Sequence, residues 1–241
     1  MLATPETEAF MTSIVARRSQ PAASIDGYDD ACGIVDECAI SGEPNQDLFA
    51  AVHFLEKNAY KTYSDPQSTQ ELWDMAQGSW KLQMSTGGSK NFSFHKPPAF
   101  LPCSFAMIDD EHFGNGVGLS ENSIWISLLH KHFYNAKQRR LVVIPQDIFL
   151  FGYRITQFIP GFVSKDPEDY VGVSPPTFVL VGCTEHALIA RGNQSGGLAV
   201  WTRLPQDVRH AAYRDYGTPG NVSKKAHPLV HRAWHINMSQ S

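Results

Sequence analysis

The sequence predicts a mainly β protein, in which helices lead into an antiparallel β-barrel and a tail follows it. Apolar and polar residues alternate from Gly78 onwards, so that Trp80, Leu82 and Met84 share one face of a strand. About nine short segments of this kind, separated by turn residues, follow up to Arg203. Closure into a barrel would remove the exposed edges of such a sheet, which favours that architecture.

We expect four regions along the chain. Residues 1–28 are polar and form a loose N-terminal arm, and residues 29–76 form a helical lead-in. Residues 77–204 form the barrel. Residues 205–241, with their Gly, Pro and polar residues, form a C-terminal tail.

The lead-in contains residues at helical spacing. The longest predicted helix follows a candidate cap at Asn45 and ends before Asp65-Pro66. A second short helix is expected from a cap near Ser68 to about Ala76. The apolar face of the longer helix comprises Leu48, Ala51, Val52, Leu55 and Ala59.

The barrel strands are bounded by Gly, Pro and Asn residues. After the strand that begins at Gly78, further strands are predicted over residues 103–108, 116–119, 123–129, 139–144, 148–151, 153–158, 178–182, 187–191 and 197–203.

The composition excludes several classes of protein. The net charge is −4 and basic residues form no patch, which argues against nucleic acid as a partner. No apolar run approaches the roughly 18 residues that span a bilayer. The first residues lack the apolar core of a secretory signal peptide, but their composition is compatible with the remains of a transit peptide. In this setting we expect reduced thiols at Cys32, Cys38, Cys103 and Cys183.

Trp80 is the strongest candidate for a structural residue. One interpretation places its indole in a ligand cavity. The favoured one makes it a barrel plug, packed under an arginine near the end of the sheet, either Arg191 or Arg203. Gly78, two residues earlier, belongs to the same motif.

A second set of residues is a candidate ligand-binding lining. Met and Phe adapt to flexible apolar ligands, although the same residues also fill protein cores. Small barrels do either, so both interpretations stay open. The set comprises Leu82, Met84, Phe105, Met107, Phe149 and Phe151.

Catalytic and metal-binding interpretations are weaker. His130 and His132 share one strand face, but no third ligand lies nearby in sequence. The acidic run that begins at Asp109 has the surroundings of a solvated turn. Cys183 precedes His186 by three residues without an evident orienting partner. We therefore predict no catalytic residue, no metal and no required cofactor.

Two motifs resemble the plastid lipid-associated proteins, also called fibrillins or plastoglobulins. Residues 72–86 contain Gly78-Ser79-Trp80-Lys81-Leu82 and are similar to the Gly-x-Trp segment that opens the domain of that family. Residues 187–203 are similar to the Arg-Gly-containing segment that closes it. The likeness spans about residues 45–204. Ala187 and Ala199 depart from the family pattern, which suggests a divergent branch such as an algal one.

The resemblance implies a lipocalin-like, calycin-type barrel without catalytic residues. It further implies a chloroplast protein that binds lipids, quinones or carotenoid-like molecules in the stroma or at thylakoid or plastoglobule surfaces. Two alternatives remain open. The first is a structural subunit of a photosynthetic membrane complex with a filled barrel, whose two polar arms order on a partner. The second is a bilin-lyase-like enzyme on a related barrel, which would need polar groups converging inside it.

Overall fold

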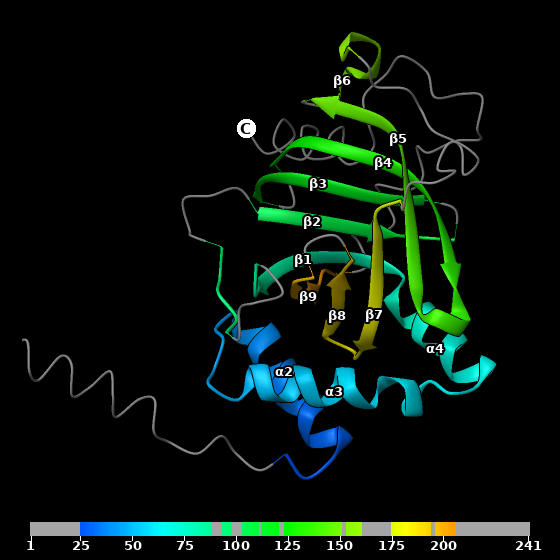
Figure 1. Ribbon diagram of the computed structural model, residues 1–241. Coiled ribbons are helices and arrows are strands. Elements are labelled where there is room, and N and C mark those ends of the chain that lie inside the picture. The colour runs from blue at the N-terminus through cyan, green and yellow to red at the C-terminus, as the bar shows by residue number, and fades with distance from the viewer. Residues whose placement is uncertain are drawn as a thin grey trace, which may run out of the picture.

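The computed structural model describes residues 25–87, 93–97, 103–110, 112–120, 123–150, 153–160, 175–193 and 196–205. Within these residues, three helices precede the strands (Figure 1). They are α2 (Tyr28–Ser41), α3 (Leu48–Thr62) and α4 (Pro66–Ala76).

The described strands form one antiparallel sheet that closes into a barrel. Their order is β4-β3-β2-β1-β9-β8-β7-β5, and β5 returns to pair with β4. The short β6 extends the free edge of β5 beyond the ring of eight. The prediction of a mainly β fold with an antiparallel barrel and N-terminal helices is therefore confirmed. The strands are β1 (Gly78–Ser85), β2 (Cys103–Ile108), β3 (His112–Ser120), β4 (Ser123–Asn135), β5 (Arg140–Leu150), β6 (Tyr153–Arg154), β7 (Thr177–Cys183), β8 (Ala187–Gly192) and β9 (Leu198–Arg203).

The helix boundaries follow from local capping. The side chain of Asn45 accepts hydrogen bonds from the backbone N–H groups of Asp47 and Leu48, which satisfies donors at the start of α3. At α4, the cap is Asp65 rather than the expected Ser68. The Asp65 carboxylate accepts from the Ser68 N–H at 2.9 Å, and Pro66 fits the first helical position, where no N–H is needed.

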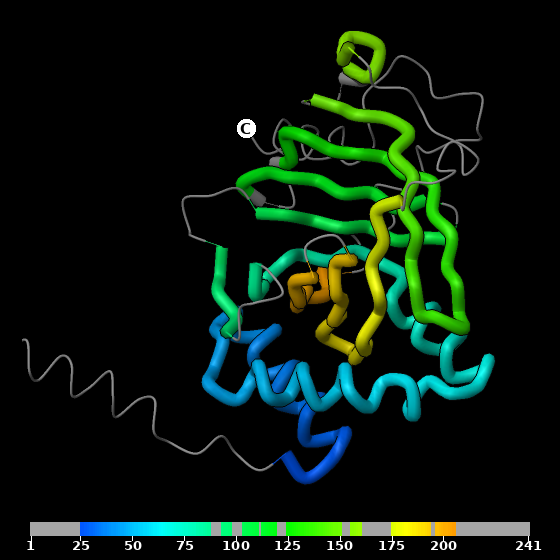
Figure 2. Tube along the Cα trace, viewed as in Figure 1, coloured from blue at the N-terminus to red at the C-terminus, as the bar shows by residue number. Residues whose placement is uncertain are grey.

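Two strands differ from the sequence prediction. The segments predicted over 139–144 and 148–151 form one strand, β5, which pairs with an extended β4. Pro145 lies opposite His130, where the register shifts, and a proline is tolerated at such an irregularity because it cannot donate a ladder hydrogen bond. The segment expected over 153–158 contains the two-residue β6 and the 3-10 turn η2 (Thr156–Phe158). Figure 2 shows the resulting long β4–β5 hairpin bending away from the neighbouring strands.

Two apolar clusters lie on opposite faces of the barrel wall. Helices α2 and α3 pack on the outer face of β7, β8 and β9, where Val35, Leu55, Val181, Ile189 and Val200 are buried together. Helix α4 instead closes one end of the barrel and contributes side chains to the inner cluster. The inner cluster comprises Leu72, Trp73, Ala76, Trp80, Ala106, Ile108, Phe113, Leu141, Val143, Leu180, Cys183, Leu188 and Ala190.

Trp80 and Arg203 hold this closed end together. The Trp80 side chain is 0% exposed, and its Nε1–H donates to the carbonyl of Ala76 at 2.8 Å. The guanidinium carbon of Arg203 lies 4.1 Å from the centroid of the indole, close enough for a cation–π interaction. Gly78 has a φ of 128°, and a Cβ there would lie 3.1 Å from the Arg203 guanidinium, so a larger residue would be strained and crowded.

The same guanidinium ties three segments to β9. It donates to the carbonyls of Met75 at 2.6 Å and Gln77 at 3.2 Å, just where α4 ends and β1 begins. Its Nε–H donates to the carbonyl of Glu185, in the turn between β7 and β8, at 2.9 Å. Arg203 is thus the partner of Trp80 and also satisfies carbonyls at the C-terminal end of α4.

We expect Trp80→Ala to lower the free energy of unfolding by about 3–5 kcal/mol, because it removes a fully buried indole and leaves a cavity. Urea unfolding followed by circular dichroism measures this loss. The control is Trp125→Ala in β4, since Trp125 is only partly buried. Equal losses in the two variants would contradict the central role of Trp80.

Candidate functional site

Near the closed end, the side chains of the inner cluster are buried against one another. A cavity of about 20 Å³ remains, which is room for roughly one water molecule, whereas ligand pockets usually measure roughly 300–1,000 Å³. This part of the barrel therefore serves as core rather than as a lipid cavity. The cavity is lined by Ala106, Ile108, Phe113, Leu141, Phe178, Leu180, Leu188, Ala190 and Trp201.

The opposite end of the barrel is less closed. The ladder between β5 and β7 covers only Arg140, Leu141 and Val142, whereas β5 stays paired with β4 up to Leu150. The free edge of β5 near Leu150 meets β6 instead of β7. The inner faces of β3, β4 and β5 therefore extend beyond the part of the wall that β7 completes.

An apolar surface lies on this extension. Residues directly opposite each other in a sheet share a face, and Val117, Ile126 and Leu150 form one such row across β3, β4 and β5. Next to it, Leu128 pairs with Ile148. We define the open-end face as Val117, Ile126, Leu128, Ile148 and Leu150, with Leu119 of the adjoining β-bulge at its rim.

The open-end face is accessible to solvent. Leu119 is 61% exposed, Ile126 is 42% exposed and Leu150 is 37% exposed. Grouped exposure of large apolar side chains marks ligand-binding or interaction surfaces more often than ordinary surface. This face is therefore the candidate functional site.

Asn115 marks the deep end of this face. It lies opposite Ala106 on β2 and Leu128 on β4, so its side chain shares the inner face with both. Its Oδ1 atom is buried and has no hydrogen-bond partner. Ala106 also lines the small interior cavity, which places Asn115 between that cavity and the open-end face.

The predicted ligand-binding residues are spread over different surfaces. Leu82 lies opposite Trp201, a residue of the inner cluster. The register of β1 shifts between Leu82 and Met84, so Met84 lies with Val200 in the outer cluster beneath the helices. This corrects the assignment of Met84 to the interior, and the cause is a β-bulge, which changes the face of every later side chain.

Phe105 and Met107 also lie outside the barrel. Ala106, between them, lines the interior cavity, and alternation sends its two neighbours to the opposite face. Phe105 lies opposite Gly116 on that outer face. Phe149 belongs to the same outer row because it pairs with Ser127, which pairs with Gly116. Phe151 lies outside the described residues.

The sequence did contain a signal for the open-end face. Residues 113–118 read Phe-Gly-Asn-Gly-Val-Gly, and Leu119 follows, so every larger side chain alternates with a glycine. The glycines mark the outer face, where a Cβ on Gly116 would lie 2.9 Å from the Ile124 side chain. Alternation then assigns Asn115 and Val117 to the inner face, whereas Leu119 lies in the β-bulge between Gly118 and Ser120.

The two strand histidines pack inside the barrel without forming a metal site. His130 Nδ1 donates to the Phe113 carbonyl at 3.1 Å, and His132 Nε2 donates to the Asp109 carbonyl at 2.5 Å. Trp73 of α4 contacts the His132 ring edge-on. Across the described ranges, no cluster of three or more His, Cys, Asp or Glu residues is placed to hold a metal ion.

The remaining candidates have structural surroundings. Burial raises the pKa of the Cys183 thiol to about 12, so it stays protonated near neutral pH and is a poor nucleophile. All four cysteines are unpaired. Asp109 accepts from the backbone N–H of His112 at 2.6 Å, and Asp110 accepts from Gln77 at 2.8 Å, which is consistent with a turn.

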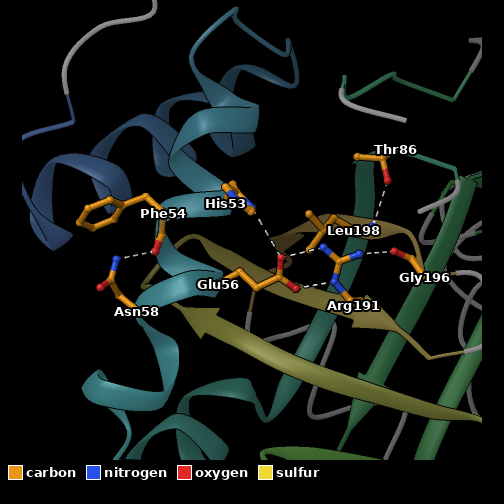
Figure 3. Close-up of polar contacts among 8 residues, drawn as sticks. All are labelled: His53, Phe54, Glu56, Asn58, Thr86, Arg191, Gly196 and Leu198. Atoms are coloured by element: carbon orange, nitrogen blue, oxygen red, sulfur yellow. Dashed lines mark hydrogen bonds and ion pairs between the residues drawn. The ribbon is translucent and has the colours of Figure 1, made fainter. Parts of the chain in front are cut away.

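Arg191, the other predicted partner of Trp80, instead joins the barrel to a helix. Figure 3 shows its guanidinium bound to both carboxylate oxygens of Glu56 in α3. The Nη2–Oε2 distance is 2.7 Å, and Nη1 donates to the Gly196 carbonyl. This pair lies on the outer side of the wall and does not reach the Trp80 plug.

Comparison with known proteins gives little further information. Neither the family models nor the curated proteins yield a match. Among solved structures, an uncharacterized protein from Bacteroides eggerthii DSM 20697 is similar at 11% identity and a TM-score of 0.34. The match covers 53% of this chain and 98% of that one. A similarity this weak carries no argument about function, and membership of the plastid family stays a prediction.

None of the helices in the described part of the chain has the length and apolar character needed to cross a bilayer.

We expect stability to fall as the pH decreases from about 6.5 to about 4. Burial lowers the pKa of His130 from 6.5 to about 4, and it also lowers the pKa of His132. Between these pH values the unfolded state binds protons that the folded state does not, and His130 alone accounts for a loss on the order of 3 kcal/mol. Urea unfolding across this range measures the slope.

The matched variants for this pH dependence are His130→Asn and His186→Asn. The first keeps a donor for the Phe113 carbonyl and should flatten the slope, while the second changes an exposed histidine and should leave it unchanged. An unchanged slope in His130→Asn would show that other groups control the acid sensitivity.

We expect a coupling energy of about 1 kcal/mol between Glu56 and Arg191 in a double-mutant cycle with Glu56→Gln and Arg191→Met. The bidentate geometry and partial burial favour a value near the upper end of the range for surface pairs. The exposed pair of Lys96 and Glu43 is the control, with an expected coupling near zero. Similar coupling energies for both pairs would contradict a special role for the Glu56–Arg191 pair in joining β8 to α3.

Proposed function

We propose that the protein is a non-catalytic binding protein for a hydrophobic small molecule, such as a lipid, a quinone or a carotenoid-like molecule. The observation that carries this proposal is the open-end face, on which Ile126 and Leu150 are exposed on the inner side of a barrel wall. Mouths of β-barrels are common sites for such ligands. The resemblance to plastid lipid-associated proteins adds a chloroplast location, at thylakoid or plastoglobule surfaces, to the proposal.

The driving force would be burial of apolar surface. Each Å² of apolar area removed from water contributes about 25 cal/mol, and no charged side chain belongs to the open-end face. The bound molecule would lie against β3, β4 and β5 rather than in the filled interior. This placement differs from a deep lipid cavity, and it predicts modest affinity because one side of the ligand remains near solvent.

A second function is favoured by the filled interior. The cavity of about 20 Å³ is also what we expect of a structural subunit that uses its barrel as a scaffold within a photosynthetic complex. The open-end face would then contact another protein. The third hypothesis, a bilin-lyase-like enzyme, needs several polar groups converging in the barrel, and the inward His130 and His132 are each engaged with a backbone carbonyl.

The test is saturable quenching of tryptophan fluorescence by a series of quinones. Ile126→Asp places a charge in the open-end face and should weaken binding by about tenfold or more, because the carboxylate would be desolvated without a partner. The matched control is Phe133→Asp on the same strand. Phe133 is 50% exposed, and it directly follows His132, which pairs with Val143 of the inner cluster, so alternation places Phe133 on the outer side.

Phe133→Asp should bind the quinones as the unaltered protein does. Equal weakening in the two variants would contradict binding at the open-end face. Absence of saturable quenching by the unaltered protein would overturn the proposal and favour the structural-subunit hypothesis.

A further inference from the structure

We infer that the molecule bound at the open-end face is an uncharged amphiphile with a hydroxyl head group, whose O–H donates to Oδ1 of Asn115. This inference rests on the proposed function and specifies the chemical class of its ligand. The ligand would enter head first and leave its apolar body against Val117, Ile126 and Leu150.

The first step is the unsatisfied acceptor. Oδ1 of Asn115 is buried and has no hydrogen-bond partner, although native proteins satisfy the great majority of buried polar atoms. Its opposite neighbours in the sheet, Ala106 and Leu128, have no side-chain donor. A donor supplied by a ligand would satisfy this atom. The ligand would reach Asn115 along the inner face, past the apolar row of Val117, Ile126 and Leu150.

The second step is the position of Asn115 along the strand. Leu119, at the exposed rim of the face, is four positions after Asn115, which corresponds to about 13 Å along β3. Below Asn115, the cavity lined by Ala106 and Phe113 measures about 20 Å³ and has no room for an alkyl chain. The head group therefore stops at Asn115, and the apolar body occupies the distance to the rim.

The third step concerns the charge and hydrogen-bonding character of the head group. Two rows across β2, β3, β4 and β5 surround the Asn115 side chain, and neither contains Lys, Arg, Asp or Glu. They are Ala106, Asn115, Leu128 and Ile148, and next to them Ser104, Val117, Ile126 and Leu150. A carboxylate, phosphate or ammonium group would therefore be desolvated there without an opposite charge. A ligand oxygen that only accepts, as in an ether or a quinone, would face the Asn115 oxygen without a hydrogen, so a quinone should bind the open-end face through its apolar surface alone. A neutral hydroxyl satisfies both conditions, because it brings a donor and no charge.

Ser104 provides a matched comparison on the same face. It lies opposite Val117, one row nearer the open end than Ala106, and its hydroxyl is the nearest other polar side chain in these rows. Unlike Asn115, it has no buried unsatisfied atom. If the hydroxyl of the ligand is recognised at Asn115, removing the Ser104 hydroxyl should not change the preference.

The experiment compares decanol, decyl methyl ether and decanoate by isothermal titration calorimetry with the full chain. We expect decanol to bind about tenfold more tightly than the ether, which corresponds to one well-formed hydrogen bond in a dry site, and decanoate to bind weakest. Asn115→Leu should bind decanol and the ether equally, while Ser104→Ala should keep the tenfold preference.

The outcomes separate the two proposals. Equal affinity of the unaltered protein for decanol and the ether would overturn the hydroxyl inference and leave binding at the open-end face intact. A preference that survives in Asn115→Leu but disappears in Ser104→Ala would also overturn it. Absence of binding for all three ligands, together with absence of quinone quenching, would overturn the proposed function itself. The ligand comparison on the unaltered protein remains decisive if Asn115→Leu does not fold.

Discussion

The contact between Arg203 and Trp80 is the interaction on which the rest of the barrel depends. Trp80 begins the sheet and Arg203 ends it, so their stacking joins the first and last long strands directly. The guanidinium also binds backbone carbonyls of Met75, Gln77 and Glu185. The Arg203 side chain thereby holds α4 across the closed end of the barrel. Carbonyl dipoles stabilise the guanidinium charge, although the Trp80 ring beneath it is completely buried.

The two ends of the barrel differ in how far the wall is completed. Near α4 the side chains of the inner cluster pack against one another around a cavity of about 20 Å³. Towards Leu150 the β5–β7 ladder ends, and the described side chains of Ile126 and Leu150 are exposed. The core at Trp80 and the proposed binding face therefore lie in different halves of one barrel, so a substitution at Ile126 can change the face without disturbing the core.

Asn115 and the histidines show how polar groups are arranged inside this apolar barrel. His130 and His132 each donate to a backbone carbonyl, and both stay neutral because burial lowers their pKa. Asn115, one row nearer the open end, keeps an oxygen without a partner. Buried atoms without a partner therefore occur in both halves, at His132 Nδ1 and at Asn115 Oδ1, and of these two the Asn115 oxygen lies where the barrel opens towards solvent.

The sequence by itself determined the class of fold and the helix faces, and it favoured a plug at Trp80 while leaving Arg191 and Arg203 open as its partner. These features rest on local signals, which can be recognised without knowing which segments pair in the fold. They are the alternation around Trp80, the helical spacing from Leu48 to Ala59 and the arginine at position 203. Only the tertiary structure decided which face each strand turns inward. The β-bulge before Met84 and the pairing of Phe105 with Gly116 reversed the expected faces, because a bulge or a long-range register changes orientation by one residue.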